Sequence, residues 1–237
     1  MPRDALRKSH IHILLNDHSS KMESRLDKAL ELTEQAVRNE TGLTIKRIDK
    51  LYVKGLVQEL NRRYAKQIGV EFDRAFKMTD NSWLKPDGGF WYVEDWPEPR
   101  RWILVAEAKR QGTNDARAQE GLPKQAKGNA IERLGKNMRG FDALFLGEDI
   151  TPFVCFGEGC DFAPDSSILD RVSTLNGFFP LNRVFVDKIK LPDGTDVLKP
   201  ASLFFRCDPW TPKEMHDVLL PVCLHAIEHY RRRYRLR

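Results

Sequence analysis

Two carboxylates and a lysine lie near the middle of the chain, where they could form one chemical group. Asp87 follows a proline, and Glu107 and Lys109 flank Ala108 in an apolar run. The alternation along residues 104–109 predicts a strand, so Glu107 and Lys109 should share one face. Neighbouring carboxylates repel each other and are suited to share Mg²⁺, which takes oxygen ligands and keeps several waters. A lysine that positions or helps to deprotonate a water would complete a site for phosphodiester hydrolysis.

Each of these short patterns also has an ordinary structural explanation. Pro-Asp is a common turn, and Glu-x-Lys is common on an exposed strand. Taken alone, the pattern therefore fits a turn followed by a strand with a solvated face as well as it fits a nuclease site.

A second polar group follows in the stretch Gly-Asn-Ala-Ile-Glu-Arg, and its apolar spacing predicts a helix from about 129 to 145. Asn129 and Arg133 are four positions apart and should share a face near the helix start. Asn can read adenine in the major groove and Arg can donate to purine acceptors, with Glu132 holding both in place. The alternative is a capped helix with a surface ion pair, which contributes little.

Together, these segments resemble the EcoRI-type restriction endonucleases within the wider PD-(D/E)xK nuclease superfamily. The matching stretches are Lys85-Pro86-Asp87-Gly88-Gly89, then residues 104–109 with Gln111-Gly112, then 128–133 with Lys136-Asn137, and more weakly 152–154, 158–159, 168–169 and Arg171. Three motifs in this order are far more specific than any one of them.

The resemblance implies a fold and a reaction. It implies an α/β restriction-endonuclease-like fold, with a central mixed β-sheet flanked by helices on both faces. It implies a magnesium-dependent type II endonuclease that acts on double-stranded DNA as a homodimer, beside a companion DNA methyltransferase that is not a bound subunit. Asp87 and Glu107 would bind Mg²⁺ with the carbonyl of Ala108 as a third ligand, and Lys109 would orient or activate the attacking water.

The resemblance also implies a reading head for a palindrome with central AATT. The residues expected to contact DNA are Gln111, Asn129, Ala130, Glu132, Arg133 and Arg171. The expected full site is GAATTC, with CAATTG as the alternative, because Thr174, Gln125 and Lys127 depart from the family pattern at positions that concern the outer base pair and the arm. The polar segment at about 110–127 would be an arm that wraps DNA, with Arg110, Lys124 and Lys127 suited to phosphate contact.

The rest of the chain predicts scaffolding for one α/β domain over residues 1–237. A capping box at Ser20-Lys21-Met22-Glu23 predicts the start of a helix that ends near residue 40. The other predicted elements are a helix at about 46–68, a hairpin of strands 90–94 and 101–109, a strand at 153–156, a helix at 168–175, strands at 184–189 and 202–207, and a helix at about 212–233.

Composition excludes some classes of protein and permits others. The chain has 237 residues with a formal net charge of +5, which permits a polyanionic partner without requiring one. No apolar run is long enough to span a membrane, and the start lacks a signal-peptide core. The four cysteines form no zinc motif, so we expect reduced, mostly buried thiols in a cytoplasmic protein.

Two features near the C-terminus favour ordinary roles. The basic segment Arg231–Arg237 is expected to be solvated more often than bound to phosphate. His225 and His229 are expected to be surface residues because no third metal ligand is near them in the sequence.

Two other functions remain open from the sequence. One is a repair or structure-specific nuclease of the same superfamily, which would cut without a palindromic site. The other is a DNA-binding protein that has lost catalysis, against which the intact Asp87, Glu107 and Lys109 argue.

Overall fold

The computed structural model describes most of the scaffold around the predicted site. The described residues are 10–56, 82–112, 114, 121, 134–135, 137–138, 140–141, 144–145, 148–162, 184, 189–190, 196–197 and 201–237. The helices with a label are α2 (His10–Thr41) and α8 (Pro212–Tyr234), with a short 3-10 helix, η1, at Cys160–Phe162. The strands are β1 (Ile45–Ile48), β2 (Leu51–Tyr52), β3 (Trp83–Leu84), β4 (Phe90–Val93), β5 (Trp102–Arg110), β6 (Phe153–Glu158), β7 (Ile189–Lys190), β8 (Asp196–Val197) and β9 (Ser202–Arg206).

The central sheet of the described residues has the strand order β1-β4-β5-β6-β9. β1, β4 and β5 pair antiparallel, whereas β5, β6 and β9 pair parallel. β5 is therefore the strand at which the two halves of the sheet meet. Its residues from Trp102 to Ala108 are all buried, as expected for a central strand covered on both faces.

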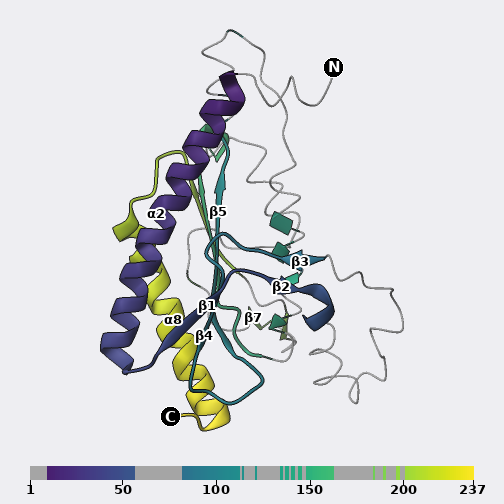
Figure 1. Ribbon diagram of the computed structural model, residues 1–237, viewed down its shortest axis with the longest axis vertical. Coiled ribbons are helices and arrows are strands. Elements are labelled where there is room, and N and C mark those ends of the chain that lie inside the picture. The colour runs from purple at the N-terminus through teal and green to yellow at the C-terminus, as the bar shows by residue number, and fades with distance from the viewer. Residues whose placement is uncertain are drawn as a thin grey trace.

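One face of the sheet is covered by α2 and α8, which lie side by side (Figure 1). Both helices bury an apolar stripe against residues such as Leu104, Ala106 and Val154. α8 begins at a complete capping box, in which the Thr211 side chain accepts from the backbone N–H of Glu214 and the Glu214 side chain accepts from the backbone N–H of Thr211. This arrangement satisfies two helix-end donors and fixes where α8 starts.

A second apolar cluster covers the opposite face of the sheet. It combines Val105, Phe153 and Cys155 of the sheet with apolar side chains from the helical residues between 134 and 144. The packing is aromatic in character, since the Phe141 ring lies 4.8 Å from that of Phe153 and 5.8 Å from that of Phe90. The predicted fold class is therefore confirmed: a mixed sheet has helices on both faces.

The predicted helix at 46–68 is wrong over its first part. Residues 45–48 form β1, the edge strand that pairs antiparallel with β4, and residues 51–52 form β2. Apolar spacing of four residues predicted a helix, but the buried Ile45 beside the exposed Lys46 and Arg47 can complete the sheet as a short edge strand. Residues 53–56 form a helical turn, and 57–81 lie outside the described residues.

The predicted helix start at Ser20 is also wrong. α2 begins at His10 and runs through this position to Thr41. Capping boxes are statistical signatures, and a serine within a helix can match the pattern without ending it.

Most other predicted elements are confirmed where the structure describes them. The hairpin appears as β4 and β5, the strand at 153–156 is the start of β6, the strand at 202–207 is β9 and the last helix is α8. The described residues between 134 and 144 are helical, as predicted for 129–145. The helix predicted at 168–175 lies outside the described residues, and of the strand predicted at 184–189 only Ile189 is seen in a strand.

The basic C-terminal segment makes internal contacts rather than standing free. Arg233 Nη1 donates to Asp149 at 2.6 Å, and Trp96 Nε1 donates to the carbonyl of Arg237 at 3.1 Å. His229 is mostly buried, with its Nε2 3.7 Å from a carboxylate oxygen of Glu148. Most of this segment is exposed, as expected of a solvated tail, although these contacts tie it to the rest of the chain. The surface position expected of His229 is wrong.

Two expectations about composition can be compared with the structure. All four cysteines are free thiols, but only Cys155 and Cys223 are buried, while Cys207 is exposed. In the part of the chain that the structure describes, no helix is long and apolar enough to cross a membrane.

Candidate active site

The β4–β5 hairpin places Asp87 opposite the end of β5. Gly88 N–H donates to the carbonyl of Ala106 at 2.8 Å, which extends the antiparallel pairing just before β4. A Cβ at Gly88 would lie 2.6 Å from the Cβ of Ala106, so this close approach requires glycine. Asp87 Oδ2 then accepts the backbone N–H of Ala108 at 3.0 Å. The hairpin therefore brings together two positions twenty residues apart, as predicted.

The ammonium of Lys109 lies among the oxygens of the predicted metal site. Lys109 Nζ donates to Asp87 Oδ2 at 3.1 Å and to the carbonyl oxygen of Ala108 at 3.0 Å, and it forms an ion pair with Glu107 Oε1. The three groups expected to coordinate Mg²⁺ thus converge on one positive charge. Two carboxylates and one ammonium leave a net charge of −1 in this group, which favours a further cation.

Glu107 is the most buried member of the group, with 1% of its surface exposed. Its Oε1 also accepts a hydrogen bond from Asn137 Nδ2 at 3.1 Å. Among the described residues, Glu107 Oε2 is buried without a hydrogen-bond partner. Burial raises the pKa of Glu107, and the Asp87 carboxylate raises it further, whereas Lys109 and Asn137 act in the opposite direction. The side chain thus stores an unfavourable interaction that a cation would relieve.

Lys109 responds to the same surroundings in the opposite way. Burial lowers the pKa of Lys109, but the carboxylates of Glu107 and Asp87 outweigh burial, so its pKa lies above the ordinary value. The lysine is therefore a firm hydrogen-bond donor in this state.

The residues present fit a hard divalent cation. Such cations take carboxylate and carbonyl oxygens, which is the donor set that surrounds Lys109 Nζ, and the buried Oε2 of Glu107 has an unused acceptor. No group of three or more His, Cys, Asp and Glu side chains placed to hold a metal occurs among the described residues. Any metal here would consequently rely on the Ala108 carbonyl and on waters besides the two carboxylates.

The chain leaves β5 through a tightly held turn. The backbone N–H of Gln111 donates to the carbonyl of Glu158 at 2.9 Å, and its carbonyl accepts from Asp161 N–H at 3.1 Å. Asn114 Nδ2 donates to Asp161 Oδ1 at 2.6 Å. Gln111 is itself buried, with 5% of its surface exposed. We call residues 159–161, with Gln111 and Asn114, the arm anchor, because they fix the start of the predicted arm.

Arg110 lies in β5 and faces a buried carboxylate rather than the expected arm. Arg110 Nη1 donates to Glu158 Oε1 at 3.1 Å, and Arg25 of α2 donates to the same oxygen at 2.5 Å. The backbone N–H of Trp210 donates to Glu158 Oε2 at 3.0 Å. Glu158 is 1% exposed, and a buried carboxylate needs partners of opposite charge. The guanidinium groups of Arg25 and Arg110 provide them. This cluster joins α2, β5, β6 and the segment before α8.

The predicted DNA-reading residues lie outside the described residues. These are Asn129, Ala130, Glu132, Arg133 and Arg171, together with the arm lysines Lys124 and Lys127. Of the residues expected at the DNA, the structure places Gln111, in the arm anchor, and Arg110, beside Glu158.

Two residues near the site were missed by sequence reasoning. Asn137 contacts Glu107 directly, and its place in the matched stretch was the one available signal. Glu23 of α2 lies close enough to Asp87 to be affected by its charge. Partial burial is the largest cause that raises the pKa of Glu23, and the Asp87 carboxylate is the second. No local pattern marks Glu23, because its approach depends on how α2 packs on the sheet.

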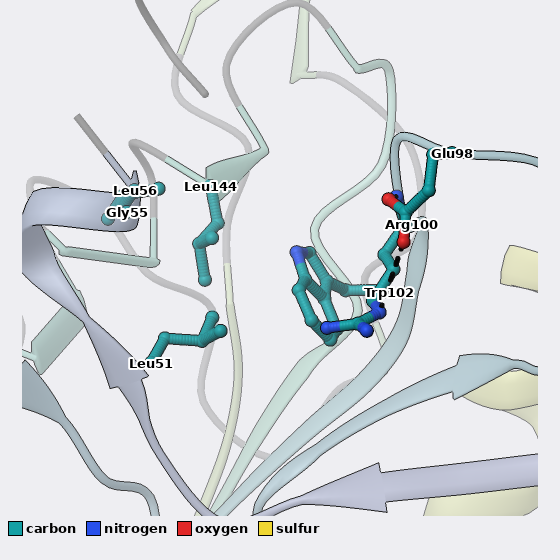
Figure 2. A pocket seen from close by; sticks show the side chains of 7 residues that line it. All are labelled: Leu51, Gly55, Leu56, Glu98, Arg100, Trp102 and Leu144. Atoms are coloured by element: carbon teal, nitrogen blue, oxygen red, sulfur yellow. Dashed lines mark hydrogen bonds and ion pairs between the residues drawn. The ribbon is translucent and has the colours of Figure 1, made fainter. Parts of the chain in front are cut away.

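A cavity of about 230 Å³ lies away from this group. Figure 2 shows Leu51, Leu56 and Leu144 on one side of the cavity and Trp102 on the other, with Glu98 and Arg100 at its rim. Neither Asp87 nor Glu107 lines it. The cavity is mostly apolar and offers no arrangement for phosphodiester chemistry.

Comparison with known proteins agrees with the geometry. A family model described as restriction endonuclease EcoRI matches residues 10–168. The chain is 30% identical over 226 residues to the type II restriction enzyme EcoRI of Escherichia coli, covering 76% of this chain and 82% of that protein. It is 29% identical over 175 residues to the type II restriction enzyme RsrI of Cereibacter sphaeroides, covering 61% of this chain and 63% of that protein. With its hairpin-borne pair of carboxylates and lysine, the chain belongs to the EcoRI family of type II restriction endonucleases.

Proposed function

We propose that this endonuclease hydrolyses double-stranded DNA, with Mg²⁺, at a palindrome whose centre is AATT. GAATTC is the full site that the sequence favours, and CAATTG is the alternative. The support for the central bases is the resemblance of residues 128–133 to the family's reading segment. The biological role is restriction of foreign DNA, with a companion methyltransferase that protects the host.

One observation carries the proposed chemistry: three oxygen groups converge on Lys109 Nζ at the end of β5. An exposed strand with a solvated Glu-x-Lys pair would not bury its glutamate to 1% exposure. Burying a carboxylate against a second carboxylate costs stability, and such costs concentrate at sites of chemistry.

The chain's residues have separate tasks in this mechanism. Asp87, Glu107 and the Ala108 carbonyl would hold Mg²⁺, which when bound polarises the scissile phosphate and stabilises the leaving 3′ oxygen. Lys109, held as a donor by its neighbours, would point a hydrogen bond at the attacking water and keep it in line with the P–O3′ bond. As that bond breaks, the water oxygen becomes bonded to phosphorus, the proton that the water loses passes to solvent, and the leaving oxygen takes up a proton from solvent, which gives a 5′-phosphate and a 3′-hydroxyl.

The proposal places the DNA-reading residues on a two-fold symmetric homodimer. Asn129, Ala130 and Arg133 would contact the central bases with Glu132 as their support, and Gln111 and Arg171 would lie nearby. A two-fold protein matches a palindromic site because each protomer reads one half. The single domain with an arm at about 110–127 is part of the same proposal.

The test is to incubate plasmid with the protein and Mg²⁺ and to sequence the ends of the products. Cuts at AATT palindromes support the proposed site, and the flanking base then distinguishes GAATTC from CAATTG. Cuts without a shared sequence would favour a structure-specific nuclease, and binding without cuts would favour a silent DNA-binding protein. Cleavage that continues in excess EDTA would contradict the metal requirement.

Substitutions connect that activity to the site. Asp87→Ala, Glu107→Ala and Lys109→Ala should each lower cleavage by orders of magnitude, because each removes a group from the reacting centre. Calcium should support binding without cutting, since it is larger and more loosely coordinated and so positions water poorly. Near wild-type cleavage by Lys109→Ala would show that Lys109 has another role.

A further inference from the structure

The side chain of Asn137 contacts the catalytic carboxylate directly. Its Nδ2 donates to Glu107 Oε1 at 3.1 Å across thirty positions of sequence. Asn137 is half-buried, and Glu107 is 1% exposed. A hydrogen bond in such a setting is sheltered from competing water.

The core packing around Asn137 fixes where its amide lies. Its helical neighbours Met138, Phe141 and Leu134 are buried in the apolar cluster beside β5. A Cβ at Gly140 would lie 2.8 Å from a methyl carbon of Leu84, so this segment sits against β3 without spare room. The amide of Asn137 is therefore held near Glu107 by closely packed neighbours.

This contact determines which oxygen of Glu107 is free. Asn137 and Lys109 both hold Oε1, whereas the buried Oε2 has no hydrogen-bond partner among the described residues. The terminal torsion of a glutamate is broad, so without such donors the carboxylate could turn. Asn137 is a neutral donor, and it can orient the carboxylate without repelling an incoming cation.

From this geometry we infer that Asn137 is a positioning residue that couples DNA reading to metal binding. The inference rests on the proposed function. Asn137 aims Glu107 Oε2 at the metal position, and Arg133, a proposed reading residue, precedes Asn137 by four positions in the sequence. When the reading residues bind the correct bases, the side-chain amide of Asn137 is placed to donate to Glu107. A wrong base displaces that donor, and catalysis falls further than binding does.

The first experiment compares wild type with Asn137→Leu, which keeps the side-chain size and removes the donor, and Asn137→Gln, which keeps an amide. Cleavage is measured on an AATT palindrome and on a duplex with one of its central bases changed. Asn137→Leu should lower kcat about 10- to 100-fold on the palindrome, with KM changed far less. In the wild type, the ratio of kcat/KM between the palindrome and the altered duplex should exceed the ratio of their binding affinities. In Asn137→Leu, the ratio of kcat/KM should fall toward the ratio of affinities. Asn137→Gln should recover part of kcat and part of the ratio of kcat/KM.

The second experiment needs no turnover. The affinity for the AATT palindrome is measured with Ca²⁺ and with EDTA at equal ionic strength. Ca²⁺ should tighten binding by the wild type, and this gain should be lost in Asn137→Leu while its affinity in EDTA stays near that of the wild type. Asn39→Ala is the matched control, because Asn39 is exposed on α2, where its amide oxygen accepts from Gln35. The control should behave as wild type in both experiments.

The outcomes separate the two ideas. A wild type that cuts AATT palindromes and an Asn137→Leu variant that keeps kcat, site preference and the calcium gain would overturn the inference alone. An equal loss on both duplexes with an unchanged preference would reduce Asn137 to a structural role and overturn the coupling. A wild type that does not cut would overturn the proposed function, and the role of Asn137 with it. If Asn137→Leu has a lower melting temperature, its loss of activity could reflect lost stability. Asn137→Gln, which keeps the amide, must then restore the preference for the palindrome if the inference holds.

Discussion

Glu107 carries much of the electrostatic cost of the candidate active site in a single side chain. Its carboxylate is almost completely buried and lies near a second carboxylate, while the ammonium of Lys109 offsets part of the cost. Because the pKa of Glu107 is raised, folding disfavours its charged form more than its neutral form. A bound cation would lower the cost of keeping the carboxylate charged.

The first prediction concerns Glu107→Gln, which replaces this carboxylate by a neutral group of the same shape. A carboxyl group with a raised pKa contributes stability that is present below its unfolded pKa of about 4.3 and is lost as pH rises. In EDTA at pH 8, Glu107→Gln should therefore melt higher than wild type, by about 2–4 °C for each kcal/mol relieved. The gain should vanish as the pH approaches 4, although cleavage is abolished throughout.

Thermal unfolding at both pH values, followed by circular dichroism, checks this prediction. Glu34→Gln is the control, because Glu34 forms an exposed ion pair with Arg38 whose loss should cost less than about 0.5 kcal/mol. A Glu107→Gln protein that melts below wild type at pH 8 would show that its pairing with Lys109 outweighs its burial.

At the residue scale, sequence predicted that Asp87, Glu107 and Lys109 lie together but not the contacts that surround them. Asp87, Glu107 and Lys109 could be found because turn and strand patterns place them on one hairpin. Asn137, Glu23 and the carboxylate of Glu158 act through contacts between distant elements, which no local spacing records. Arg110 was misjudged for the same reason: its buried partner lies on β6.

Among the elements, the arm anchor is the junction between the rigid sheet and the segment expected to wrap DNA. Gly159 has a φ of +124°, and a Cβ there would lie 2.2 Å from the carbonyl oxygen of Gln111. The anchor therefore depends on both the conformation and the size of glycine. The resemblance places Gln111 near the bases. Its backbone bonds to Glu158 and Asp161, the one before Gly159 in the chain and the other after it.

The second prediction is that Gly159→Ala loosens this junction. It should cost at least about 2 kcal/mol from backbone strain and displacement, and it should weaken affinity for the specific site more than for random duplex. Gly42→Ala is a matched control outside the predicted arm, since Gly42 has a φ of +71° but open space around it, so it bears strain without a clash. Equal effects of the two substitutions on stability and on site preference would contradict a special role for the anchor.

The third prediction concerns the start of α8. Arg206 donates to both carboxylate oxygens of Glu214 at 2.8 and 2.7 Å, and this pairing, with bonds from Thr211, lowers the pKa of Glu214 to about 2. A depressed pKa contributes stability that is present above the unfolded pKa of about 4.3 and is lost as pH falls toward about 2.

Glu214→Gln should therefore lower the melting temperature at pH 7, and the difference in melting temperature from wild type should narrow as the pH falls from about 4.3 toward about 2. Because Glu214 is partly exposed, the effect should not exceed about 1 kcal/mol. Melting curves across this pH range test it, with Asp217→Asn, in an exposed pair with Lys213 on the same helix, as the control. A difference that stays constant with pH would exclude the charge of Glu214 as the cause.

At the element scale, the spacing of apolar residues predicted the correct element where it fitted only a helix or only a strand. It predicted the wrong element where the same residues could form either one. The sequence predicted β4, β5 and β9 because each is a short, mostly apolar run, and it predicted α8 because its buried residues recur at helical spacing. Residues 45–52 carry a spacing of four, yet they form strands, since hydrogen bonds with β4 and β3 outweigh local preference. The start of α2 was misplaced because a helix can continue through a capping signature.

The whole molecule presents a modest positive charge to a strongly negative partner. Its net charge of +5 is enough to favour association with DNA at low salt, but it carries no information about sequence. Specificity must then come from a few side chains at base edges, and affinity for random duplex from lysines and arginines at phosphates.

The fourth prediction separates these two contributions. Asn129→Ala and Arg133→Ala should each weaken binding to an AATT palindrome by about 1–3 kcal/mol per half-site, because each removes a base contact. Their affinity for a scrambled duplex should barely change. Lys124→Ala should weaken both duplexes alike and make the salt dependence shallower. Fluorescence titrations at several salt concentrations measure all three, and an equal loss on both duplexes for Asn129→Ala would make this segment a structural cap.

The division of the sheet at β5 has a consequence for the order of folding. β4 and β5 are joined by the short connection 94–101, whereas the β5–β6 ladder can form only after the chain from 111 to 152 has closed a long loop. Loop closure costs entropy before it gains contacts, so the antiparallel half should form first and carry Asp87, Glu107 and Lys109 into proximity early. Substitutions at the β4–β5 turn should then slow folding, while Gly159→Ala should chiefly speed unfolding. In that case Asp87, Glu107 and Lys109 would be brought together by the antiparallel half of the sheet, which forms first. The parallel half, which forms later, would then hold them in a fixed arrangement.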